Sequence, residues 1–202
     1  MKRTTGLQRV PLLILTILSL VASAHLPAQA TCEEIDPLLV LPNDGVCQGW
    51  IRDGEPVKAT TIEELAEIID GAAYLYGQYG FVAAAFQNYS GEVAGEPTLM
   101  TLAAFNQGTA ENAEALYNDS DSGSGDPVGD WNGTGQARMR IAFGTVTFQF
   151  WETCFFVSII VVTGGEEAVP AARCIADAVV NLIQNPTAAD QRTWGGLRIL
   201  FR

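Results

Sequence analysis

The segment Cys154–Val162 constrains the fold of this 202-residue chain more than any other, because nearly every residue in it is apolar. Ser158 is the exception, and Glu152 and Thr153 precede the segment as a tight turn. Apolar residues on both faces are typical of a central strand that is covered on both sides. The segment is too short to cross a bilayer as a helix. We therefore expect a second layer, or a partner subunit, over the face that the helices leave open.

Four other segments have the composition of strands and are bounded by turn residues. They are Phe81–Tyr89, Thr98–Phe105, Ala137–Phe143 and Thr145–Trp151. Turn residues beginning at Ser90-Gly91 separate the first two, which we expect to pair antiparallel. The predicted fold class is α+β, with a mainly antiparallel sheet of about five strands packed by two longer helices and one short helix.

Three segments are predicted to be helical. Thr61 and Glu64 match a capping box, and apolar residues at helical spacing continue the first helix through Tyr76. A second, short helix is expected to begin after Thr109. The third is the clearest, since apolar residues recur at steps of three and four across 171–183. We predict no second domain and no internal repeat.

The first thirty residues have the pattern of a signal peptide. Three basic residues precede the apolar run Val10–Ala24, and Ala28-Gln29-Ala30 is a small-x-small cleavage motif. An uncleaved membrane anchor is the less favoured alternative, because the apolar run is shorter than a membrane span requires. We therefore expect residues 1–30 to be the signal, 31–185 a single domain and 186–202 a C-terminal tail. The protein is expected to be exported, either to the periplasm or out of the cell.

The mature chain is strongly acidic. The full sequence contains 11 Lys and Arg residues and 23 Asp and Glu residues, and three of the basic residues lie in the signal. The remaining chain therefore carries a net charge of −15. Such a charge repels phosphate backbones and anionic lipids. We expect no nucleic-acid partner and no stable membrane insertion after signal cleavage.

The mature chain has no histidine, since His25 lies in the signal. This absence excludes Ser-His-Asp and Cys-His catalysis and any zinc site built on imidazole. A pair of carboxylates could still catalyse glycoside hydrolysis without histidine. The sequence nominates no catalytic residue, no metal ligand and no cofactor.

Four cysteines remain after signal cleavage: Cys32, Cys47, Cys154 and Cys174. An even number in an exported domain predicts two disulfides with three possible pairings. Proximity in sequence favours Cys32–Cys47 and Cys154–Cys174. The second pair has a geometric difficulty, because one cysteine begins a strand and the other lies early in the following helix.

Asp70 and Tyr74 are the candidate ligand-binding residues. Asp70 interrupts an apolar helical stretch, so it could be a buried carboxylate with a raised pKa that contacts a ligand. The favoured alternative is structural, with Asp70 bonding a backbone amide or Tyr74. The neighbouring Tyr76 and Tyr79 either line a pocket or belong to the core.

The segment Asn118–Gly135 is rich in Asp, Ser, Gly and Asn and is predicted to be a long loop. Its oxygen-bearing side chains could bind calcium, but the segment lacks the EF-hand pattern. We therefore predict no metal site there.

Several motifs resemble the domain-of-unknown-function 6599 family of exported bacterial proteins. They are Leu41-Pro42, Trp50, Leu65-x-x-Ile68-Ile69-Asp70-Gly71-Ala72-Ala73-x-x-Tyr76, Tyr79-Gly80-Phe81, Asn112-Ala113 and Phe150-Trp151. The resemblance extends over roughly 41–183. This chain departs from the pattern at Glu152-Thr153-Cys154, which suggests a disulfide particular to this sequence. The resemblance implies the fold and export, and it implies no activity.

These observations favour an exported, non-catalytic domain that binds a small ligand or another protein, or that has a structural role. The partner could be a second copy of the chain or a different protein. The alternative is a carboxylate-dependent hydrolase that acts outside the cytoplasm. A buried Asp70 that faces a second acid across a cleft would favour the hydrolase.

Overall fold

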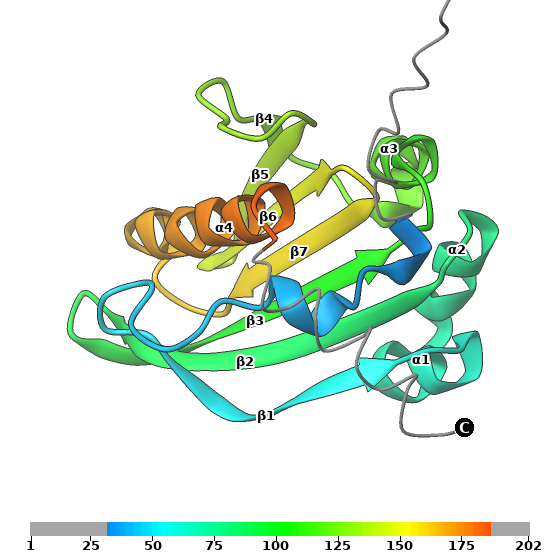
Figure 1. The fold of residues 1–202 in the computed structure, drawn as a ribbon. Coiled ribbons are helices and arrows are strands. Elements are labelled where there is room, and N and C mark those ends of the chain that lie inside the picture. Colours follow the sequence, from blue (N-terminus) through cyan, green and yellow to red (C-terminus); the bar gives the residue numbers. More distant parts are fainter. Residues whose placement is uncertain (1–31, 187–202) are drawn as a thin grey trace, which may run out of the picture.

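The computed structural model describes residues 32–186, which form a seven-stranded antiparallel sheet packed by helices (Figure 1). The strand order is β1-β2-β3-β7-β6-β5-β4, with every neighbouring pair antiparallel where pairing is described. The strands are β1 (Ile51–Ala59), β2 (Ala83–Val93), β3 (Glu96–Asn106), β4 (Asp126–Pro127), β5 (Ala137–Ala142), β6 (Thr145–Glu152) and β7 (Phe155–Val161). The α+β class and the antiparallel pairing of the first two predicted strands are confirmed.

The apolar segment that dominates the sequence forms β7, the middle strand of the seven. Phe155, Val157, Ile159 and Val161 alternate along one face of the sheet and are completely buried. On the opposite face, Phe156 is also completely buried. The predicted central strand is therefore confirmed, with one face fully covered and the other covered at its first residues.

The fully covered face packs against two elements. Helix α4 (Val169–Gln184) lies over β6 and β7, and the N-terminal segment 32–50 lies over β2 and β3 (Figure 1). This segment contains two 3-10 helices, η1 (Cys32–Glu34) and η2 (Pro37–Val40), and η2 also contacts α4. The Tyr89 hydroxyl donates a hydrogen bond to the Pro42 carbonyl at 2.8 Å, which joins the segment to the sheet.

The opposite face is covered only at one end. Helix α1 (Ile62–Ile69), the short 3-10 helix η3 (Asp70–Ala72), helix α2 (Ala73–Gln78) and helix α3 (Ala110–Asn118) contribute to this covering layer. The Tyr76 ring stacks on Phe105 with the centroids 4.0 Å apart. Beyond these helices Leu99 remains 48% exposed, and Ile160 and Val162 are also exposed. The expected second layer or partner over this region stays a prediction.

The sheet has seven strands, where about five were predicted. The missed β1 lies in a segment for which the sequence predicted no element, and the missed β4 lies inside the predicted long loop. β1 is an edge strand whose pairing with β2 is interrupted between Asp53 and Val57. Charged residues and irregular pairing are typical of edge strands, and they hide the alternation on which sequence prediction depends.

The predicted caps are confirmed, but the first helix is interrupted. The Thr61 hydroxyl accepts a hydrogen bond from the Glu64 amide, and the Glu64 carboxylate accepts one from the Thr60 amide at 2.7 Å. The continuous helix expected through Tyr76 ends instead at Ile69, because Asp70 adopts a positive φ of 55°. An Asp-Gly pair marks a turn, which agrees with the helix ending here.

Candidate functional site

The four cysteines form two disulfides, Cys32–Cys154 and Cys47–Cys174, so the pairing favoured by proximity in sequence is wrong. The Cα atoms are 5.9 Å apart in both disulfides, a usual separation for the bond. Each disulfide joins residues that are more than 120 positions apart in the chain. Both connect the N-terminal segment to the unit made of β7 and α4.

The direction of these elements explains the pairing. The N-terminal segment crosses one face of the sheet from end to end (Figure 1). Cys32 is at the start of this segment and Cys47 is near its close, so the two cysteines are at different ends of the sheet. β7 begins just after Cys154, and α4 runs back over the sheet from its other end, with Cys174 near its start. Cys154 and Cys174 are therefore at different ends, which is the geometric difficulty noted in the sequence.

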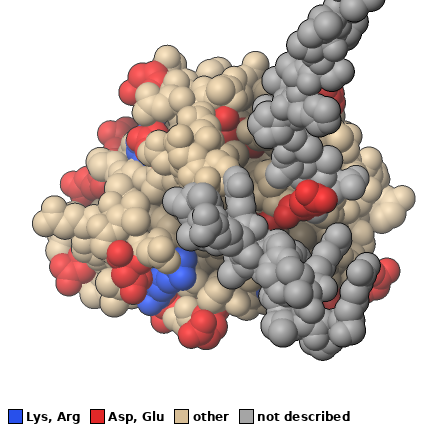
Figure 2. All heavy atoms as spheres, viewed as in Figure 1, with Lys and Arg blue, Asp and Glu red and all other residues tan. Residues whose placement is uncertain are grey.

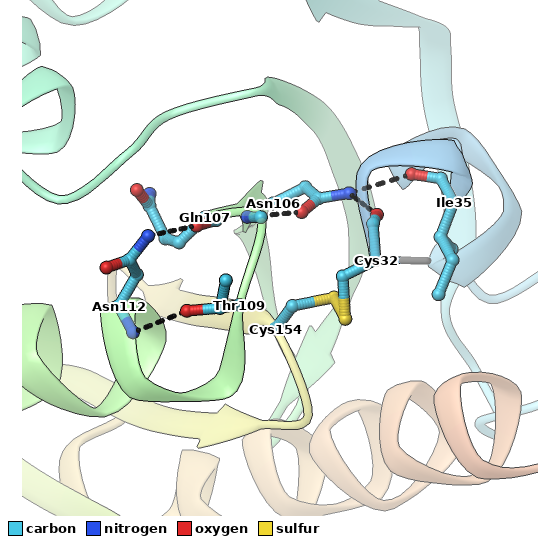
Figure 3. Close-up of a disulfide and its surroundings, with 8 residues drawn as sticks. Cys32, Ile35, Asn106, Gln107, Thr109, Asn112 and Cys154 are labelled. Carbon is cyan, nitrogen blue, oxygen red and sulfur yellow. Dashed lines mark hydrogen bonds between the residues drawn. A yellow bond between two sulfur atoms is a disulfide. The ribbon is translucent and has the colours of Figure 1, made fainter. Parts of the chain in front are cut away.

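We call the end of the sheet that contains Cys32–Cys154 the closed end (Figure 3). Asn106, the last residue of β3, is completely buried there. Its side-chain Nδ2 donates to the carbonyls of Cys32 and Ile35, and its Oδ1 accepts from the Gly108 amide at 2.9 Å. The side chain thereby satisfies three partly buried backbone groups and holds η1 against the sheet.

Glu152 is a second buried polar residue near the closed end, with 1% of its surface exposed. Its carboxylate accepts hydrogen bonds from the Thr134 amide and hydroxyl, both at 2.7 Å, and from the Gln184 side chain at 3.2 Å. The carboxylate joins the long loop and the end of α4 to the sheet. Because its oxygens are already occupied by protein donors, we assign it a structural role. Sequence reasoning treated this residue only as part of a turn.

Gln107 differs from its neighbours at the closed end. Its side chain is completely buried, yet neither its amide nitrogen nor its amide oxygen has a hydrogen-bond partner in the part of the chain that the structure describes. By contrast, both backbone groups of Gln107 are hydrogen-bonded. Its amide donates to the Cys154 carbonyl, and its carbonyl accepts from Asn112 Nδ2 (Figure 3). A buried amide without partners destabilises the folded state.

The other end of the sheet, which we call the pocket end, has a cavity beside Cys47–Cys174. Its volume is about 310 Å³, at the lower limit of small-ligand sites. Three chain segments form its walls: the end of the N-terminal segment, the β2–β3 turn and the start of α4. The lining residues are Cys47, Gln48, Trp50, Glu92, Val93, Ala94, Glu167, Pro170, Ala171 and Cys174.

Local sequence features shape these walls. Ala94 and Gly95 both have positive φ and make the tight turn between β2 and β3. Gly91 lets the Trp50 ring pack directly on β2, since a Cβ at that position would lie 2.6 Å from the ring. Pro170 occupies the first turn of α4, where its missing N–H costs no helical hydrogen bond. The disulfide then links the segment of Trp50 covalently to α4.

The pocket has an acidic character. Glu167 lines it from the 3-10 helix η5 (Gly165–Ala168) that precedes α4. Glu92 lines it from β2, but its neighbours Gly91 and Val93 face Trp50 and Gly164, so alternation directs the Glu92 side chain to the opposite face of the sheet. The described lining of the pocket contains no Lys or Arg. Acidic side chains are also scattered over the visible face of the molecule, with few basic ones (Figure 2). The electrostatic potential at the pocket is therefore expected to be negative.

The sequence-nominated Asp70 and Tyr74 lie away from this pocket. Asp70 is exposed at the interruption between α1 and α2, so the buried carboxylate considered from the sequence is wrong. Tyr74 is 72% exposed, and neither residue lines the pocket. The exposed Asp70 does not give the buried carboxylate that would have favoured the hydrolase alternative. Ligand binding by these two side chains stays a prediction.

The two neighbouring tyrosines have different environments. Tyr76 belongs to the core under α2, and burial raises its pKa to about 12. The Tyr79 hydroxyl donates a hydrogen bond to the Asp119 carboxylate, which raises the pKa of Tyr79 and lowers that of Asp119. Both are therefore engaged in holding helices and loops together.

The long acidic loop is also held by internal contacts. The Arg138 guanidinium donates to the Tyr117 carbonyl, the Ser122 hydroxyl and the Gln149 side chain.

Within residues 32–186, no three His, Cys, Asp or Glu side chains gather closely enough to hold a metal ion. In the same part of the chain, no helix has the length and apolar character of a membrane span.

Comparisons with known proteins show no relative in sequence. No family model matches the chain, and no curated protein matches it. Among solved structures, the extracellular domain of PknH from Mycobacterium tuberculosis is similar at 14% identity with a TM-score of 0.41. The similarity covers 72% of this chain and 96% of that domain. It is too weak to carry a function to this chain.

Proposed function

We propose that this protein is an exported, non-catalytic domain that binds a small ligand in the cavity at the pocket end. The observation that carries the proposal is a preformed cavity of about 310 Å³ whose walls are joined by the Cys47–Cys174 disulfide. A covalent link between two walls limits their relative motion, so less conformational freedom is lost when a ligand binds.

Export is supported by two independent features. The signal pattern in residues 1–30 is a property of the sequence, and these residues lie outside the described part of the structure. The two disulfides are a property of the fold, and such bonds persist in oxidising compartments. Membership of the domain-of-unknown-function 6599 family remains a proposal that rests on the motifs alone.

The non-catalytic part of the proposal is supported by the chemistry of the lining. Glu92 and Glu167 are the charged groups there, and the other lining residues are Gln48, two cysteines in a disulfide and apolar side chains. Gln48 has no acidic or basic function, and disulfide-bonded cysteines supply no thiolate nucleophile. Two exposed carboxylates at a shallow cavity favour binding over bond cleavage.

The test is a screen of small fragments by ligand-observed NMR against the mature chain. Gln48→Trp places a large ring at the mouth of the pocket from an exposed position, so it leaves the core unchanged. Asn181→Trp on α4 is the matched control, because Asn181 is exposed like Gln48 and does not line the pocket. We expect fragments to bind the native protein and the control but not Gln48→Trp. Fragments that bind all three equally, or none that bind the native protein, would contradict the proposal.

A further inference from the structure

Five large apolar side chains are exposed on one face of the sheet, which we call the open face. Paired residues of antiparallel strands share a face, so the register places all five on the side opposite α4. They are Ile51 and Val57 on β1, Leu99 on β3, Ile160 on β7 and Val162 directly after it. These five are half of the ten large apolar residues exposed in the part of the chain that the structure describes. Such a concentration indicates a contact surface.

The sequence continues beyond the described residues with the segment 187–202, which is apolar and basic. Its residues Leu197, Ile199 and Phe201 recur at every second position, the period of a strand with one apolar side. Trp194 precedes them and adds a further large apolar side chain. A segment with this pattern is expected to bury its apolar side against another surface.

Charge favours contact between this segment and the domain. Residues 32–186 contain 22 acidic and 5 basic residues and carry a net charge of −17, whereas 187–202 contain one acidic and three basic residues and carry +2. On the open face, the β1 and β2 side has the exposed Asp53 and Glu92, while Arg140 is on the distant β5. The basic segment is therefore attracted to this side, and a second copy of the acidic domain is repelled.

The segment is long enough to reach the open face. Helix α4 ends at the closed end, where the Gln184 side chain donates to the Glu152 carboxylate at 3.2 Å. The edge strand β1 is four strand spacings from β6, or about 20 Å. Residues 187–197 extend over about 36 Å. Leu197 can therefore pass around β1 and lie beside Val57, which is near the closed end of that strand.

The structure of β1 favours contact through the face over addition of a strand at the edge. Pro56 has no N–H to donate, and the pairing of β1 with β2 is interrupted between Asp53 and Val57. Proline and irregular pairing both disfavour the addition of another strand. The exposed side chains of the open face are therefore the contact that β1 offers.

We propose that the C-terminal segment 187–202 docks on the open face and packs its alternating apolar residues against the exposed apolar side chains there. The segment then forms the second layer that the two-sided apolar character of β7 predicts. The inference is independent of ligand binding at the pocket end, because the open face and the pocket are different surfaces.

The first experiment compares methyl NMR spectra of the mature full chain and of a variant in which Leu197, Ile199 and Phe201 are replaced by Ser. We expect the Leu99 methyl signals to shift, because the variant removes the Phe201 ring from the open face. Ile141 is the internal control, since it is 40% exposed on the other face and its signals should not shift. Unchanged Leu99 signals would overturn the proposal. A sedimentation mass of two chains, with Leu99 signals that depend on concentration but not on the variant, would instead assign the face to a second copy and also overturn it.

The second experiment tests the same contact from the sheet. Trypsin cleaves after the arginines of the segment, and docking protects these bonds. Leu99→Gln with Ile160→Gln changes the open face, whereas Val46→Gln with Ile141→Gln changes side chains of similar exposure elsewhere. We expect cleavage of the segment, followed by mass spectrometry, to become about tenfold faster in the first variant and to stay within about twofold in the second. Loss of about 60 Å² of apolar contact corresponds to a change of that size in the docking equilibrium. Equal cleavage rates in the two variants would overturn the proposal.

Discussion

The two ends of the sheet each contain one disulfide, but the surroundings of the two bonds differ. At the closed end Cys154 is completely buried, and the adjoining backbone is held by Asn106. At the pocket end Cys47 is likewise buried and Cys174, like Cys32, is partly exposed, but this bond contributes to the wall of a cavity. The same kind of crosslink therefore completes the core at one end and supports a binding site at the other. Covalent chemistry alone does not determine what a disulfide does in a fold.

The loss of chain entropy in the unfolded state is the same for the two disulfides. When one bond is intact, the loop that the other bond closes consists of residues 32–47 and 154–174, joined by the intact crosslink. This loop has about 35 residues for either bond. A loop of that length corresponds to about 4 kcal/mol in either case. If removal of the two bonds lowers the free energy of unfolding by different amounts, the difference therefore comes from their surroundings.

The largest expected effect is the loss of either disulfide. Replacing Cys32 and Cys154 by Ala should lower the free energy of unfolding by about 5 kcal/mol, since a cavity in the core adds about 1 kcal/mol to the entropic term. Replacing Cys47 and Cys174 by Ala should also cost about 5 kcal/mol, because Cys47 is buried in the same core. Urea unfolding of the two double variants measures both values. A clear difference between the two losses would show that the surroundings of the bonds, and not the crosslinks alone, set the stability they contribute.

The next effect concerns the polar support of the closed end. Asn106→Ala leaves the carbonyls of Cys32 and Ile35 and the amide of Gly108 without their partner, so we expect a loss of about 2–3 kcal/mol. Asn88→Ala is the control, because its side chain bonds Thr101 at the surface and its loss should cost less than about 0.5 kcal/mol. Equal losses, measured by urea unfolding, would mean that Asn106 does not support this end.

A gain in stability is expected at the buried amide beside it. Gln107→Met keeps the approximate size of the side chain and removes two unpartnered polar atoms, so the free energy of unfolding should rise by about 1 kcal/mol. The same denaturant titration gives this value. A loss of similar size would show that the amide is satisfied by bound water, and the closed end would then be fully paired.

The smallest effect is expected at the pocket end. Glu92→Gln with Glu167→Gln should change the free energy of unfolding by less than about 0.5 kcal/mol, because both side chains are exposed and have no protein partner among the described residues. Thermal unfolding at pH 7 tests this expectation. A large destabilisation would assign the carboxylates a role in folding, and the contrast between the two ends would weaken.

Much of the fold follows from local sequence. The strand cores, the caps at Thr61 and Thr109 and the long final helix all lie where periodicity and capping residues predict them. The helix interruption at Asp70 also had a local signal, the Asp-Gly pair, which the apolar periodicity obscured. β1 escaped prediction because edge strands carry charges and irregular pairing.

The candidate site was far less predictable. Trp50 and Cys174 are visible in the sequence as an aromatic residue and a cysteine, but no local pattern brings them to one cavity. Glu92 and Glu167 are two among 23 acidic residues, and nothing in their neighbours distinguishes them. The nominated Asp70 and Tyr74 were singled out by their place in a helix, and the structure places both at the surface.

The sequence by itself determined the α+β class, the central position of the apolar strand and the absence of histidine from residues 31–202. These properties depend on composition or on neighbours within one or two turns of the chain. Only the tertiary structure decided which cysteines pair, which segments line the cavity and which face of the sheet stays open. The disulfides join residues more than 120 positions apart, and all of these outcomes are set by the packing of whole elements rather than by neighbours in the chain.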